Sequence, residues 1–230
     1  MLLDAGDALV GSGKLGEKTS GEVIIAGMNL MSYDAMALGP KELSLGPDLL
    51  RLRMGEADFP ILSANAVLTG SEQLVAEPYT ILDVGGHQVG VIGLTRAQGA
   101  APAGFQVLDP QQALERYLPE VREKAGTVIL LTNLENNAAL ALARAVPGVD
   151  LVIGALPSQA PVSSVRVPDT NTLVVVADLA APGHSGRRVG VLLATLGSDG
   201  SLTGESWQSP WLGTTIADDP EMQALLDKYR

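Results

Sequence analysis

The stretch Asn29-Leu-Met-Ser-Tyr-Asp-Ala-Met-Ala-Leu-Gly-Pro-Lys-Glu42 limits the possible folds and reactions of this chain more than any other part of it. It starts within a predicted helix, Ser20–Ser32, and ends on three side chains of very different chemistry. Pro40 offers no side-chain oxygen, Lys41 carries an ammonium group, and Glu42 is a carboxylate. An ammonium group repels a divalent cation, which prefers several oxygen ligands. The segment alone therefore does not provide a metal site.

Composition sets limits on the class of protein. A chain of 230 residues with 46% hydrophobic residues suits one large or two small domains with a substantial core. The net charge of −11 repels phosphate backbones, so we expect no nucleic-acid partner. The chain has no Cys, which excludes a disulfide framework, a thiolate zinc site and a thiol nucleophile.

Hydropathy gives no sign of a membrane segment. No uninterrupted apolar run reaches the roughly 18 residues that a membrane span needs. Met1 is followed directly by a predicted strand, rather than by the basic and apolar regions of a signal peptide. We therefore expect no membrane span and no signal peptide in the chain as given, and the residues alone do not identify a compartment.

Helical and strand patterns alternate along the chain, which is typical of α/β or layered α+β architecture. The predicted helices are Ser20–Ser32, with Ser20 as its cap, Pro47–Gly55, Pro110–Ala125, Ala138–Val146 and Pro220–Tyr229, with Asp218 and Asp219 at its N-terminal end. The predicted strands are Met1–Leu3, Phe59–Ala66, Thr127–Leu131, Asp150–Ile153, an antiparallel pair Thr172–Ala177 and Arg188–Leu196, and a hairpin in which Gly85-Gly86 joins Tyr79–Val84 to His87–Leu94.

Several motifs in this order resemble the calcineurin-like metallophosphoesterases, specifically the N-terminal domain of their 5′-nucleotidase and UDP-sugar hydrolase branch. That family has a leucine-rich strand ending in Gly-Asp, then a helix, then Asp-Ala-x-x-x-Gly-Asn-His-Glu. Here Leu2-Leu-Asp-Ala-Gly-Asp7 and Asp34-Ala-Met-Ala-Leu-Gly-Pro-Lys-Glu42 follow that frame. Further similar segments are Phe59–Asn65, Pro78–Ile81, Gly90–Thr95, Thr127–Leu134 and Val146–Gly154. The resemblance implies a metallophosphoesterase-like β-sandwich flanked by helices over residues 1–217, with residues 218–230 similar to the helical linker into a separate C-terminal domain.

The same resemblance implies which positions would hold the two divalent ions of the family. Asp7 matches the bridging carboxylate. The other five positions that the chain covers carry Pro40, Lys41, Asn133, Leu156 and Ser158 in place of Asn or His. The family's first strand, with its Asp-x-His pair, is absent, and the two His residues of this chain match none of the ligand positions. Asp7 and Asn133 remain as remnants, so we expect neither metal nor any other cofactor.

The surviving polar residues have ordinary structural interpretations. Asp7 is expected to cap a following helix or turn, and Glu42 to pair with Lys41 or with solvent. Lys41 is expected on the surface, with an alternative role as an anion-binding residue in the former active-site cleft. Glu42 and Asn65 are the other candidate ligand contacts in that cleft. No catalytic residue is expected.

Two functions therefore compete. The first is a non-catalytic metallophosphoesterase-like domain that binds or scaffolds a protein partner, or binds an anionic ligand near Lys41. The alternative is a metal-dependent phosphoric ester hydrolase completed by residues outside this chain. The first is favoured because a single relaxed requirement explains all five replaced ligands. Family relatives are mostly exported, which implies an extracytoplasmic location by resemblance alone.

The absence of the family's first strand predicts an open sheet edge. That strand would lie beside Leu2–Gly6, so the apolar strand is expected to lack one neighbour. An unpaired edge is a template for strand addition. We predict that it is covered, either by a rearranged segment of the same chain or by a second copy in a homodimer.

Overall fold

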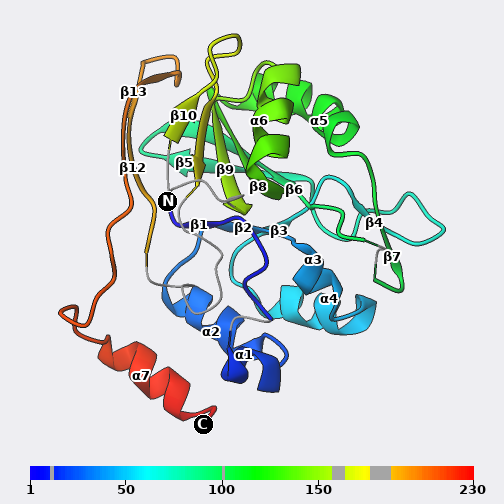
Figure 1. Cartoon of the computed structure of the whole chain (residues 1–230), viewed down its shortest axis with the longest axis vertical. Coiled ribbons are helices and arrows are strands. Elements are labelled where there is room, and N and C mark those ends of the chain that lie inside the picture. Colours follow the sequence, from blue (N-terminus) through cyan, green and yellow to red (C-terminus); the bar gives the residue numbers. More distant parts are fainter. Residues whose placement is uncertain (11–12, 100–101, 157–163, 177–187) are drawn as a thin grey trace.

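The computed structural model describes residues 1–10, 13–99, 102–156, 164–176 and 188–230. Two β-sheets face each other, and helices cover the outer face of each sheet (Figure 1). The smaller sheet is parallel, with the order β1 (Leu3–Asp4), β2 (Ala35–Ala37) and β3 (Ile61–Leu62). The larger sheet has the order β10 (Ser164–Arg166), β11 (Leu173–Val176), β9 (Leu151–Leu156), β8 (Thr127–Glu135), β6 (His87–Leu94) and β5 (Tyr79–Val84).

The centre of the larger sheet is parallel and buried on both faces. Strands β11, β9, β8 and β6 run parallel, and β10 and β5 are antiparallel strands at the two ends of the order. Such strands need apolar side chains on both faces, and eight of the nine residues of β8 are buried. One face packs against α5 (Pro110–Lys124) and α6 (Asn136–Ala145).

The smaller sheet separates two further parts of the core. Ala35 and Ala37 of β2 face the larger sheet, whereas Met36 and Leu38 face the helices, because side chains alternate along a strand. The helical layer on this side consists of α2 (Glu22–Leu30), α3 (Pro40–Leu43) and α4 (Pro47–Glu56). The predicted layered α/β sandwich flanked by helices is confirmed.

The remaining elements lie at the margins of the sandwich. They are α1 (Lys14–Lys18), the antiparallel pair β4 (Ala66–Leu68) and β7 (Phe105–Val107), the hairpin β12 (Val191–Leu196) and β13 (Leu202–Gln208), and α7 (Pro220–Asp227). Helix α7 lies against α2 (Figure 1), and just beyond it the Tyr229 hydroxyl donates to Glu22 (3.1 Å). No helix in the described part of the chain is long and apolar enough to cross a bilayer.

Two local predictions were wrong. Ser20 does not cap α2: Gly21 is the N-cap, and both residues have positive φ values, 49° for Ser20 and 87° for Gly21. Strands β11 and β12 do not pair with each other, since β11 lies between β9 and β10, and β12 pairs with β13. The reason is burial: β11 is buried along its whole length and suits the middle of a sheet, whereas β12 is mostly exposed. Asp219 lies at the N-terminal end of α7 as predicted, and its side chain also caps the helix by accepting from the Glu221 and Met222 amides (2.9 Å each).

Strand β1 lies at one end of the order in the smaller sheet, paired with β2. Leu3 of β1 packs against the apolar cluster between the sheets, and so do Leu192 of β12 and Trp207 of β13. The hairpin of the same chain therefore shares the core that lies beneath β1. Coverage of this edge by a second copy stays a prediction.

Candidate functional site

The polar residues of interest meet where parallel strands end. The carboxyl ends of β1 and β2, and of the neighbouring strands β6 and β8, bring together Asp7, Gly39, Arg96 and Asn133, the strand-end cluster. A Cβ atom at Gly39 would overlap Asp7 Oδ1 and lie 2.8 Å from Asn133 Nδ2. The position therefore has no room for a side chain. In open α/β sheets, ligands usually bind at the carboxyl ends of the strands.

Glu42 is hydrogen-bonded to the backbone of two residues of this cluster, Asp7 and Gly39. It is fully buried, and its Oε1 accepts the Leu9 amide (2.9 Å) while its Oε2 accepts the amides of Asp7 (2.9 Å) and Gly39 (2.8 Å). The bond to Gly39, the N-cap of α3, gives the backbone amide at the start of this helix an acceptor, as the Glu of a capping box does. The prediction that Glu42 pairs with Lys41 or solvent is therefore wrong, because the carboxylate serves as an internal acceptor that joins two loops.

Burial changes the acidity of two carboxyl groups in this region. Desolvation raises the pKa of Glu42 to about 7, and the nearby Asp7 charge adds to the rise while the three amides oppose it. Desolvation likewise raises the pKa of Asp4 to about 6, with the Gly6 amide opposing and Asp7 again adding. The two shifts share a cause, since both groups lie in a poorly hydrated region next to a third carboxylate.

Asp7 caps a helix, but not one that follows it directly. Its Oδ1 accepts the Lys41 amide (2.9 Å) at the start of α3, 34 residues further along the chain. Its Oδ2 lies 3.8 Å from Arg96 Nη2. Asp7 has a φ of 66°, a left-handed conformation that Asp tolerates better than most residues. The side chain of Asp7 is 11% exposed, so little of this carboxylate faces solvent.

Arg96 was missed by the sequence interpretation. Its amide donates to Asn133 Oδ1 (2.7 Å), its Nε to the Asn133 carbonyl (3.1 Å), and its Nη2 to Gln98 Oε1 (3.2 Å). The sequence contained one signal, a cationic residue two positions after the apolar strand that ends at Leu94. That signal gains meaning only when the neighbouring strand ends are known to meet there.

Asn133 and Asn65 are both fully buried and bonded to the backbone. Asn133 Nδ2 donates to the Leu38 carbonyl (2.8 Å), and its Oδ1 accepts the Arg96 amide. Asn65 Nδ2 donates to the carbonyls of Thr95 (2.8 Å) and Leu108 (3.0 Å). Its Oδ1 accepts the Thr95 amide (2.8 Å). This geometry favours a structural role for Asn65 over the ligand contact expected from the sequence.

The described residues do not fit a pair of divalent ions. Such a site needs about six ligands, mostly carboxylate and imidazole. In the ranges that the structure describes, no three His, Asp or Glu residues are grouped so that they could share a metal. Asp7 Oδ1 accepts an amide, Asp7 Oδ2 faces a guanidinium, and Glu42 accepts three amides. The Leu156 side chain and Ser158 lie outside the described residues.

Lys41 is exposed, although its backbone amide is bonded to Asp7. Its ammonium group forms no ion pair with a described residue. A role in binding an anion therefore stays a prediction.

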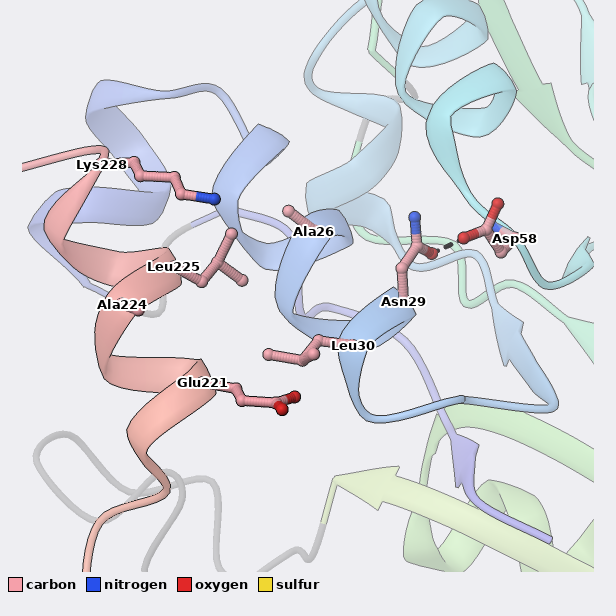
Figure 2. A pocket seen from close by; sticks show the side chains of 8 residues that line it. All are labelled: Ala26, Asn29, Leu30, Asp58, Glu221, Ala224, Leu225 and Lys228. Carbon is pink, nitrogen blue, oxygen red and sulfur yellow. Dashed lines mark hydrogen bonds between the residues drawn. The ribbon is translucent and has the colours of Figure 1, made fainter.

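A separate groove lies between α2 and α7, with a volume of about 560 Å³ (Figure 2). It is lined by Ala26, Asn29, Leu30, Asp58, Glu221, Ala224, Leu225 and Lys228. Asn29 is held by the Glu56 carbonyl and by the Asp58 amide, so its amide group is already engaged. None of the strand-end cluster lines this groove, and the sequence interpretation did not find it.

No protein-family model matches the chain, but comparison with individual proteins and solved structures finds relatives. The trifunctional nucleotide phosphoesterase YfkN of Bacillus subtilis is 30% identical over 193 residues, covering 67% of this chain and 13% of that protein. The venom 5′-nucleotidase of Crotalus adamanteus is 30% identical over 257 aligned residues, covering 100% of this chain and 42% of that protein. The crystal structure of a 5′-nucleotidase precursor from Thermus thermophilus superposes with a TM-score of 0.86 at 28% identity, covering 99% of this chain and 48% of that one. The chain thus spans less than half the length of each.

Proposed function

The chain belongs to the calcineurin-like metallophosphoesterases, in the 5′-nucleotidase branch, and we propose that it is a non-catalytic domain of this family that acts as a binding or scaffolding module. The observation that carries the proposal is the state of the strand-end cluster. Its carboxylate and amide groups are bonded to the protein itself, and a guanidinium faces the one remaining carboxylate oxygen.

Chemistry supports this interpretation. Hydrolysis of phosphate esters at two-metal sites depends on a metal-bound hydroxide, and without it the nucleophile is bulk water. Uncatalysed hydrolysis of phosphate monoesters is among the slowest reactions known in biology. Pro40 and Lys41 replace two ligand types at the start of α3, and Asn133 uses both ends of its amide within the protein.

Net charge limits the kind of partner that we propose. The charge of −11 disfavours nucleic acid and anionic lipid, and it is compatible with a protein partner that presents basic groups. A small anion at Lys41 is the other ligand that the sequence suggested. Both belong to a module that binds without turnover.

The proposal is tested by turnover. The purified chain is assayed with Mn²⁺ and Zn²⁺ on nucleoside monophosphates, UDP-sugars and bis-phosphate esters, beside an active 5′-nucleotidase as positive control. We expect background rates for the chain and for its Asp7→Ala variant alike. Metal-dependent turnover of the purified chain that is lost in Asp7→Ala would refute the proposal. Turnover that appears only when the longest natural form of the chain is assayed would establish the alternative, a hydrolase completed by residues outside this chain.

A further inference from the structure

We propose that Arg96 is the counter-ion of Asp7. Its guanidinium group stabilises the strand-end cluster at the place where related enzymes are expected to hold metal ions. The inference rests on the proposed function, since it explains how the cluster is stable without divalent ions. It assigns to Arg96 a positioning role.

Two hydrogen bonds to Asn133 fix the direction of the Arg96 side chain. The Arg96 amide and Nε both bond to Asn133, one to the side-chain oxygen and one to the main-chain oxygen (2.7 and 3.1 Å). Nη2 is held further by Gln98 and points within 3.8 Å of Asp7 Oδ2. The side chains of Arg96 and Asp7 are only 16% and 11% exposed. Such a fixed and poorly hydrated pair is screened by salt less than a surface pair.

Charge balance points the same way. Asp4, Asp7 and Glu42 lie close enough for the Asp7 charge to disfavour ionisation of the other two. Among the ion pairs of the described residues, only one includes any of these three carboxyl groups, and it joins Arg96 to Asp7.

Arg96 also engages both remnant oxygen ligands. Asp7 Oδ2 faces its guanidinium, and Asn133 Oδ1 accepts its amide hydrogen. A divalent ion entering the cluster would have to approach a fixed positive charge and compete for these same two atoms. The residue that stabilises the cluster therefore also excludes a metal from it.

The test is a double-mutant cycle of thermal unfolding with Asp7→Asn and Arg96→Gln, measured in EDTA so that metal plays no part. Asparagine at position 7 still accepts the Lys41 amide, so this substitution mainly removes charge. We expect Asp7→Asn to lower Tm by about 2–4 °C in the wild-type background, where it breaks an ion pair. In the Arg96→Gln background the same substitution should raise Tm or leave it unchanged, because it relieves the repulsion from Asp4 and Glu42, keeps an acceptor for the Lys41 amide and breaks no ion pair.

The control is Arg51→Gln, which removes an exposed arginine paired with Asp48 and should shift Tm by less than about 1 °C. Should Arg96→Gln fail to fold, Arg96→Lys replaces it in the cycle and should give a smaller change of the same kind. An equal Tm shift for Asp7→Asn in both backgrounds, or a rise in the wild-type background, would overturn the proposal. A different result would contradict the proposed function, namely metal-dependent turnover of the unmodified chain.

Discussion

Gly39→Ala is a sensitive probe of the strand-end cluster. Gly39 has a φ of −114°, which any residue can adopt, so the substitution introduces no backbone strain. The added methyl group would overlap Asp7 Oδ1 and lie 2.8 Å from both Asp7 Cγ and Asn133 Nδ2. Asp7 would have to move away from the Lys41 amide that it caps.

The expected loss can be worked out from these contacts. Overpacking of a close-packed site costs about 1–3 kcal/mol. Weakening a hydrogen bond to a charged acceptor costs about 1.5–3 kcal/mol more, and alanine gains back about 0.4–1 kcal/mol by restricting the unfolded chain. We therefore expect the free energy of unfolding to fall by about 2–5 kcal/mol.

Urea unfolding at 25 °C, followed by far-UV circular dichroism, measures this loss. Gly55→Ala is the matched control, since a Cβ atom there meets no atom within 4 Å and Gly55 is exposed in α4. The control should gain about 0.5–1 kcal/mol, because alanine is the better helix former. A loss below about 1 kcal/mol for Gly39→Ala would refute the close packing of Gly39, Asp7 and Asn133.

Two further predictions concern the buried polar groups. Burial raises the pKa of Glu42 from 4.5 to about 7, so the folded state binds more protons than the unfolded state between these pH values. The stabilisation that this proton gives the folded state is present below pH 4.5 and is lost as pH rises through 7. Urea unfolding should show about 2–3 kcal/mol less stability at pH 8 than at pH 5, and a flat or rising profile would contradict this. Asn65→Asp should destabilise the chain by about 3 kcal/mol or more, since a buried carboxylate would replace a donor to the Thr95 and Leu108 carbonyls. Exposed Asn137→Asp, at the start of α6, is its control, and equal stability of the two variants would count against the structural role of Asn65.

Elements with a strong local pattern could be predicted from the sequence. The hairpin β5–β6 has the bounds expected, because Gly85 and Gly86 both adopt positive φ between two strand-like runs. Helix α5 likewise carries its own signals, with Asp109 as a cap and Pro110 in the first turn. Strand β2 has three residues, too few for a periodic pattern to be distinguished.

The chemistry of the cluster could be predicted only in part. The sequence shows the motif in which the ligands are replaced, and this motif indicated the family and the position of Asp7. The burial of Glu42 and the pairing of Arg96 depend on four strand ends meeting, which no local pattern encodes. Charged residues are usually exposed, so an exposed Glu42 was the natural expectation from sequence.

Metal content tests the central claim most directly. The purified chain is exposed to an excess of Mn²⁺ and Zn²⁺, passed through a desalting column, and analysed for both elements beside an active 5′-nucleotidase. Our account predicts well under one tightly held ion per chain, because Arg96 and the backbone amides already engage the Asp7 and Asn133 oxygens. Two ions per chain would contradict it.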